Sequence, residues 1–462
     1  MRVGVGQTAQ GAHMAWGGGQ AHGALGQHAE ALARWEEALR IYRGSGGGRA
    51  ADPGDVAVAL DNLGTACKNV GRFEDALERH GEALEIRRRL HGRGHLDVAT
   101  SLMGLGNVHA ALGEHDDAVA RYDEALGIQR ELLDGANPDV ARTLNNLAIV
   151  HRKLGRHDEA LARYGEALRI KQAALGYDHV DTARTLGNMA GAYHSLGRHG
   201  EALEHYERAL AIFRAALGPG QVESAKTMVN IANLHEAQGR HDEALAAFEA
   251  AVPLLRAALG AEHTTVATAL MNMGLVLSSL RRYEEALGCL EEALEIQRQL
   301  LGVHSPSLAT TLLNLGGVYK LLHRNHEALR HYERALAIQE RTLGRHHPEV
   351  ALTRYNLGDC YERVGRVDAA RGAVAAAHAA FDARQGPAHP YTRMTAQWLR
   401  ELDRRAPRPT EPDGLGRHSA LTHYSLPIMA LVALMVIVAF FLGGGSPAGD
   451  LALSPGARAA GR

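Results

Sequence analysis

Asparagine recurs at one position of a 42-residue period, and this line of amides is the first feature of the sequence that could do chemistry. An amide side chain can hydrogen-bond the backbone of an extended peptide. It can equally tie one repeat to the next, and strict repetition favours this second role, because a recognition surface should vary. Seven of eight periods carry the residue, with Gly104 as the exception: Asn62, Asn146, Asn188, Asn230, Asn272, Asn314 and Asn356.

A second column, four residues before the asparagines, varies from one period to the next. Its centre is basic, and such a surface suits an acidic peptide or a C-terminal carboxylate. The alternative interpretation is a column of solvated charges without a ligand. In chain order the column is Val58, Thr100, Arg142, Arg184, Lys226, Thr268, Thr310 and Leu352. Together with neighbouring positions, the predicted peptide-binding residues are Arg142, Asn146, Arg152, Arg184, Asn188, His194, Lys226 and Asn230.

Histidine, with 27 residues, supplies the remaining candidate metal ligands and catalytic groups. One turn column contains His115, His157, His199 and His241, and other periods place Phe73 and Tyr283 there. That exchange indicates a ring that packs, and a single ligand in each repeat does not build a tetrahedral metal site. No Ser-His-Asp group, carboxylate pair or phosphate loop stands apart from the repeat pattern. We therefore expect no metal, no cofactor and no catalysis.

Pairs of helices must position these side chains. Residues 135–176 show the pattern best, with two apolar sets at helical spacing and a turn at Gly155 between them. One such hairpin is too thin to bury its own apolar faces, so copies must stack. Small residues recur where stacked helices would otherwise clash. One small column is Ala76, Ala118, Ala160, Ala202, Ala244, Ala286, Ala328 and Ala370.

The predicted fold is all-α, a solenoid of eight 42-residue repeats over residues 51–386. Residues 1–25 are rich in glycine and are predicted to be disordered. Residues 26–50 match a partial capping repeat, which three inserted residues displace from the regular spacing. Residues 387–403 are predicted to be a capping helix, and residues 404–425 a proline-containing linker.

Residues 426–445 are a candidate transmembrane helix, followed by a predicted disordered tail at 446–462. The 17 apolar residues 426–442 reach about 26 Å at 1.5 Å per residue. Basic residues gather on the repeat side, which predicts a C-terminal anchor with the repeats on the cytosolic face of a membrane. The alternative is a docked helix or an unstructured tail, with the protein in the cytoplasm or on the cytoskeleton.

Composition bounds the remaining possibilities. The net charge is −2, which excludes an overall affinity for nucleic acid. Aromatic residues make up only 5% of the chain, as expected for helices packed through alanine and leucine. The three cysteines lie far apart in sequence, which argues against a disulfide framework and fits a reducing compartment.

The repeat resembles the tetratricopeptide repeat in its longer, 42-residue form. The segments VARTLNNLA at 140–148, GRHDEALARY at 155–164 and LGRHHPEVA at 343–351 are similar to kinesin light chain repeats. The resemblance implies a right-handed superhelix whose first helices line a concave, peptide-holding groove. Kinesin light chains use that groove to hold cargo adaptors, so kinesin heavy chain enters as an alternative partner. This sequence departs from those light chains by lacking their long N-terminal heptad segment and by its apolar C-terminal stretch.

The sequence as a whole predicts a non-enzymatic interaction scaffold. We expect it to bind acidic peptide segments of partner proteins in the concave groove and to be tethered to a membrane through its C-terminal helix. One alternative is a soluble, kinesin light chain-like cargo adaptor of a microtubule motor. Another is a structural spacer without a peptide ligand.

Overall fold

The computed structural model describes residues 28–44 and 52–405 of the chain. These residues form 18 helices, and no strand occurs among them. The chain divides into two compact units, with the boundary between Ala216 and Leu217. The predicted disordered N-terminus at 1–25, the candidate transmembrane helix at 426–445 and the tail at 446–462 lie outside the described residues. Within the described part, no helix is long and apolar enough to cross a bilayer.

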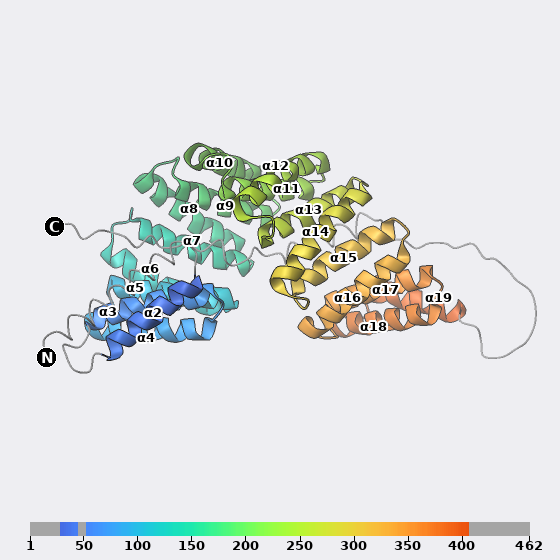
Figure 1. Cartoon of the computed structure of the whole chain (residues 1–462), viewed down its shortest axis with the longest axis horizontal. Helices are drawn as coiled ribbons and strands as arrows, with labels where there is room; N and C mark the ends of the chain where they lie inside the picture. The colour runs from blue at the N-terminus through green and yellow to red at the C-terminus, as the bar shows by residue number, and fades with distance from the viewer. Residues whose placement is uncertain (1–27, 45–51, 406–462) are drawn as a thin grey trace, which may run out of the picture. The chain divides into compact units, whose positions relative to one another are not determined.

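Unit 1 contains the first nine described helices, which form stacked hairpins (Figure 1). Each hairpin consists of a first helix and a second helix joined by a short turn. The second helices α4, α6, α8 and α10 start at the regular interval that the repeat predicts. The bounds are α2 His28–Gly44, α3 Pro53–Asn69, α4 Phe73–His91, α5 Leu96–Leu112, α6 His115–Leu132, α7 Pro138–Lys153, α8 His157–Leu175, α9 Val180–Ser195 and α10 His199–Leu217.

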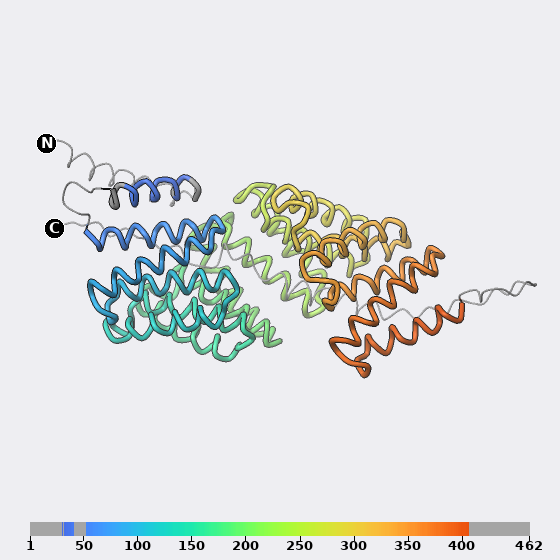
Figure 2. Tube along the Cα trace, turned by 90° about the horizontal axis from the view of Figure 1, so that it is seen from below, coloured from blue at the N-terminus to red at the C-terminus, as the bar shows by residue number. Residues whose placement is uncertain are grey.

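Unit 2 is built of the same kind of hairpin, and α19 is its last described helix (Figure 2). Its helices are α11 Val222–Ala237, α12 His241–Leu259, α13 Thr264–Ser279, α14 Tyr283–Leu301, α15 Pro306–Leu321, α16 Asn325–Leu343, α17 Pro348–Arg363, α18 Val367–Gln385 and α19 Pro390–Arg405. The all-helical repeat fold is therefore confirmed. The predicted capping segments contain α2, which buries Trp35 and Leu39 against α3, and α19, which packs Trp398 on α17 and α18.

Close packing explains the recurring small residues. The alanines of the second-helix column, Ala76 to Ala370, are fully buried. In the repeats that have glycine on the first helix, a side chain of the second helix lies directly against the backbone there. A Cβ added to Gly316 would meet the Tyr332 ring at 2.6 Å, and one added to Gly106 would meet Tyr122 at 2.6 Å. A larger side chain at either glycine would force the two helices of the hairpin apart.

The one gap in the asparagine column also has a packing cause. A Cβ on Gly104 would lie 2.4 Å from Nδ1 of His80, so no asparagine fits there. His80 stands where five other repeats have tyrosine or phenylalanine. It bonds Oδ1 of Asp61 at 2.8 Å, and Arg87 and Ser101 contact Oδ2 of the same carboxylate at 2.5 and 3.0 Å.

Within each unit, a buried side-chain pair joins most second helices to the first helix that follows. In most repeats a glutamine or a cation on the second helix bonds a hydroxyl group on the first helix that follows, and both side chains are buried. In α12 and α13 the two positions are apolar instead, with Leu255 and Ala269. The polar pairs are Arg87–Ser101 at 2.9 Å, Gln129–Thr143 at 2.6 Å, Lys171–Thr185 at 2.9 Å, Gln297–Thr311 at 2.7 Å and Gln339–Thr353 at 2.6 Å.

Candidate functional site

The first helices form the tighter side of each stack. Direct contacts join α3 to α5, α5 to α7 and α7 to α9 in unit 1, and α11 to α13 and α13 to α15 in unit 2. Successive second helices are linked instead by ion pairs between long side chains. Examples are Arg88 with Glu124 at 2.5 Å and Arg130 with Glu166 at 2.6 Å. Within each unit, successive first helices therefore lie against one another more closely than successive second helices do.

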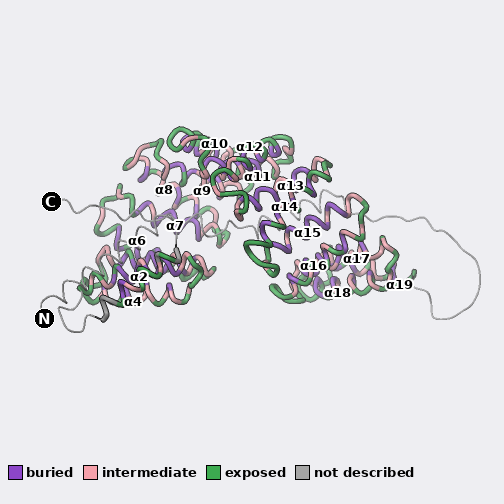
Figure 3. The backbone as a smooth tube through the Cα atoms, in the orientation of Figure 1, coloured by how far each residue is buried: buried purple, intermediate pink, exposed green. Residues whose placement is uncertain are grey.

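The variable column of the first helices is accessible to solvent, whereas the residue that follows it in each repeat is buried. Figure 3 shows buried and more exposed stretches alternating along the helices. In unit 1, Val58 is 41% exposed and the Arg184 side chain 48% exposed. In unit 2, Thr268 is exposed and Lys226 is half-buried. Positions that repeat along the chain thus lie inside the stack, and the side chains at the positions that vary are open to solvent.

The basic centre of this column is partly balanced by acidic neighbours. Arg142 lies 3.0 Å from Asp139, and Arg184 lies 2.9 Å from Asp181, in both cases one turn back on the same helix. The spacing of three residues could have revealed both pairs from the sequence. The net positive charge of the surface around the two arginines is therefore smaller than the number of arginines suggests.

Lys171 is a third cation at this place, and the sequence analysis missed it. Its Nζ donates to the Asp181 carbonyl at 3.2 Å and to Thr185 Oγ1 at 2.9 Å, between α8 and α9. Burial is the largest of the effects that lower the pKa of Lys171 to about 8; Asp181 opposes the shift, and the charges of Arg184 and Arg142 add to it. The lysine stays largely protonated at neutral pH. Three cations thus stand against two carboxylates at this point of unit 1.

The asparagines link successive first helices. Asn146 is only 3% exposed, and its Nδ2 donates to Oδ1 of Asn107 at 3.2 Å. Asn188 donates to Asn145 at 3.4 Å, and in unit 2 Asn272 donates to Asn233 at 3.0 Å. This geometry is the repeat-to-repeat tie that the strict recurrence favoured. Of the three predicted binding asparagines, Asn230 is exposed, Asn188 is half-buried and Asn146 is buried.

The other predicted binding residues lie in the last turns of first helices or in unit 2. Arg152 is half-buried at the end of α7, near the turn into α8. His194 is half-buried at the end of α9, with its ring 5.3 Å from the ring of His199. Burial, and then the charge of His199, lower the pKa of His194 to about 4. His194 is therefore neutral at pH 7 and adds no charge to the basic face of unit 1, and Lys226 lies in α11 of unit 2.

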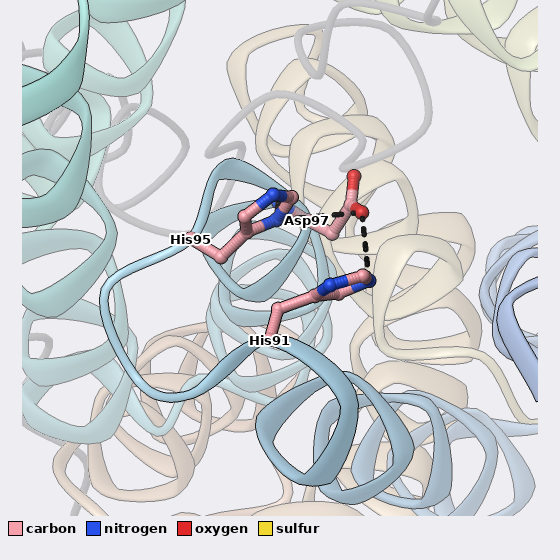
Figure 4. Close-up of side chains that lie close together, drawn as sticks. All are labelled: His91, His95 and Asp97. Carbon is pink, nitrogen blue, oxygen red and sulfur yellow. Dashed lines mark hydrogen bonds and ion pairs between the residues drawn. The ribbon is translucent and has the colours of Figure 1, made fainter.

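Two groups of possible metal ligands come together in unit 1, although no metal was predicted from the sequence. Within each group, one ligand atom per residue lies within 4.8 Å of the others. The groups are His91, His95 and Asp97 (Figure 4), and His109, Glu114 and Asp117. Each group takes its three residues from three different positions of the repeat, so no single column of the sequence reveals it. A departure from the consensus of one column, such as His91 where other repeats have leucine, was the available signal.

Comparisons with known proteins place this geometry in context. The sequence profile of the tetratricopeptide repeat family matches residues 55–131, 139–215, 223–299 and 307–383. A comparison with curated protein sequences gives no match.

Similar solved structures share little sequence identity with this chain, so the likeness concerns the fold alone. BtubC (BKLC) from P. vanneervenii is 22% identical over 50% of this chain and 94% of its own, with a TM-score of 0.44. A Podosopora anserina putative kinesin light chain with nearly identical TPR-like repeats is 20% identical over 44% of this chain and 97% of its own, with a TM-score of 0.40. A Rap protein complexed with competence and sporulation factor is 15% identical over 76% of this chain and 99% of its own, with a TM-score of 0.48.

Proposed function

The chain belongs to the tetratricopeptide repeat family, and from that premise we propose that it is a non-enzymatic scaffold that binds acidic peptide segments of partner proteins on its first helices. The observation that carries the proposal is the exposure of the variable column beside buried, repeating columns. Residues that differ from repeat to repeat contribute little to a uniform stack, and on an accessible wall they can distinguish one ligand from another.

The preferred ligand chemistry follows from the cations of unit 1. Arg142, Lys171 and Arg184 lie together, with Asp139 and Asp181 as their carboxylate neighbours. Exposed ion pairs one turn apart on a helix contribute only about 0–1 kcal/mol each, so a peptide carboxylate can take over an arginine at small cost. Lys171 is held in place by its bonds to the Asp181 carbonyl and to Thr185, and its charge adds to that of the two arginines. An extended acidic segment is the ligand that this balance favours.

A peptide screen with two matched triple variants tests this proposal. Acidic, neutral and basic peptide libraries are offered to the full chain, and the affinities of selected peptides are measured by fluorescence anisotropy. Arg142→Glu, Arg184→Glu and Lys226→Glu together reverse the first-helix cations. Arg88→Glu, Arg130→Glu and Arg256→Glu together reverse the same number of charges on second helices, where each arginine pairs with a glutamate of the next repeat.

We expect acidic peptides to be selected, and the first-helix triple variant to weaken them at least about tenfold, at roughly 1 kcal/mol per contact. The second-helix triple variant should change the affinity by less than about threefold. Equal losses in both variants would mean that only net charge matters and would refute the assigned surface. The absence of any binder above background would favour the structural spacer instead.

Attachment to the cytosolic face of a membrane is a separate part of the proposal, and the sequence of residues 426–445 alone supports it. A fluorescent fusion should sit on a membrane with the full chain and become diffuse without residues 418–462. Resistance of the full chain to carbonate extraction should separate insertion from peripheral docking. Co-purification of kinesin heavy chain, with a diffuse full-length fusion, would support the soluble cargo adaptor instead.

A further inference from the structure

The loop between α4 and α5 brings two imidazoles and a carboxylate together (Figure 4). Oδ2 of Asp97 lies 3.6 Å from Nε2 of His91 and 3.4 Å from Nδ1 of His95. The two imidazole rings stack with their centroids 4.3 Å apart. All three side chains are partly open to solvent, with exposed fractions of 37%, 44% and 50%. An ion from solution can therefore reach them.

One residue of this group sets its repeat apart from the others. His95 and Asp97 follow their columns: histidine also precedes a first helix at His179, His263 and His347, and Asp181 matches Asp97. His91 does not follow its column, because the equivalent residue in six other repeats is leucine. These residues are Leu133, Leu175, Leu217, Leu259, Leu301 and Leu343. The third ligand therefore arises from a single departure from the repeat.

We propose that His91, His95 and Asp97 bind a divalent transition-metal ion, with zinc as the best-matched probe. Imidazole and carboxylate are ordinary zinc ligands, and ligands about 2.0–2.1 Å from a tetrahedral zinc ion stand roughly 3.4 Å apart. The two nitrogen-to-oxygen distances of 3.4 and 3.6 Å already fit such an edge. Water fills the fourth position, since three protein ligands leave it open. This inference is independent of peptide binding.

Two neighbouring contacts set the strength of the site. Nδ1 of His95 accepts the backbone N–H of Asp97 at 3.2 Å, so metal binding replaces a helix-capping bond and the affinity is modest. Arg87 donates to the Asp97 carbonyl at 2.7 Å, and its charge is paired with the Asp61 carboxylate. That pairing limits the repulsion that the guanidinium exerts on an incoming cation. Because imidazole must be neutral to bind, the affinity falls at acid pH.

Zinc titration of the metal-free full chain tests the site, with zinc chloride competed against a fluorescent zinc indicator. His91→Leu installs the residue of the other repeats, so the fold is retained, which a melting curve checks. Leu175→His performs the reverse change and builds the same triad with His179 and Asp181. Glu114→Arg removes the second ligand group by installing the arginine found at that position in the other seven repeats.

We expect His91→Leu to weaken the tightest zinc binding at least about tenfold and Glu114→Arg to leave it unchanged. Leu175→His should add one weaker site, because Arg184 pairs with the Asp181 carboxylate. The NMR signals of the His91 and His95 imidazole rings should shift together when zinc is added. The proposal is overturned if the His91→Leu titration superimposes on that of the unaltered chain. It is equally overturned if Glu114→Arg alone abolishes the tightest binding.

Discussion

Replacing Arg87 with leucine should strongly destabilise the first repeats, because the change leaves a carboxylate buried without its cation. The side chains of His80, Asp61 and Arg87 are only 3%, 11% and 6% exposed. After the substitution, Asp61 retains His80 at 2.8 Å and Ser101 at 3.0 Å. Removing one partner of a buried ion pair costs about 3–5 kcal/mol.

Unit 2 supplies the matched control. The equivalent positions around α11, α12 and α13 are Val229, Phe248, Leu255 and Ala269, all apolar. Converting the whole cluster to this set requires Asp61→Val, His80→Phe, Arg87→Leu and Ser101→Ala. Replacing a buried ionic cluster by well-packed apolar residues is often neutral or stabilising. The fourfold variant should therefore lie within about 1 kcal/mol of the unaltered chain.

Native-state hydrogen exchange is the appropriate assay, because a repeat array opens locally and does not unfold in one step. At about 1.4 kcal/mol per factor of ten, amides of α3 to α5 in Arg87→Leu should lose protection by a factor of about a hundred to a few thousand. The fourfold variant should restore it. A loss below about 1 kcal/mol in Arg87→Leu would refute the role given to the charge. An equal loss in both variants would point to packing instead.

Three further changes test other parts of the fold. Burial raises the pKa of Glu236 to about 7, so the stability from its protonated form is present below pH 4.5 and is lost as pH rises through 7. Glu236→Gln should therefore raise the free energy of unfolding, measured in urea, by up to about 3 kcal/mol at pH 8 and leave it unchanged at pH 4. An equal gain at both pH values would exclude titration of Glu236 as the cause. His323 has a left-handed φ of 58° where six repeats have glycine, so His323→Gly should raise the melting temperature with a gain of about 1 kcal/mol, and a decrease would contradict the strain argument. Trp398 donates to Glu362 at 2.7 Å and meets the Tyr355 ring edge-on at 5.1 Å. Trp398→Ala should cost about 2–3 kcal/mol of stability and speed hydrogen exchange first in α19 and α17. Unchanged exchange would show that α19 does not cap the stack.

The sequence predicted the regular part of this fold well, because every repeat reports the same constraints. The repeat period matches the helix starts, and the small columns are buried as expected. The asparagine column also shows the repeat-to-repeat bonds that its recurrence favoured, as Asn146 with Asn107 illustrates. Such features are averages over many copies, so a single sequence contains several observations of each.

Contacts between different columns were not predictable in the same way. Gln129 and Thr143 lie on different helices, and nothing in either column alone indicates that they bond at 2.6 Å. The missing asparagine at Gly104 becomes intelligible only when the His80 ring is seen against it. Lys171 was missed beneath the basic surface for the same reason. Side chains that meet across columns depend on how far each repeat advances along the stack, which the period does not state.

Side-chain footprinting of the full chain with a selected acidic peptide tests the central claim most directly. That claim is that the varying, exposed column of the first helices recognises the ligand, while the repeating columns hold the stack. We expect the peptide to reduce the labelling of first-helix residues in α7 and α9, Arg142 and Arg184 among them, and to leave Arg130 and Arg163 on the second helices labelled as before. Protection of the second helices, with unchanged labelling of α7 and α9, would contradict it.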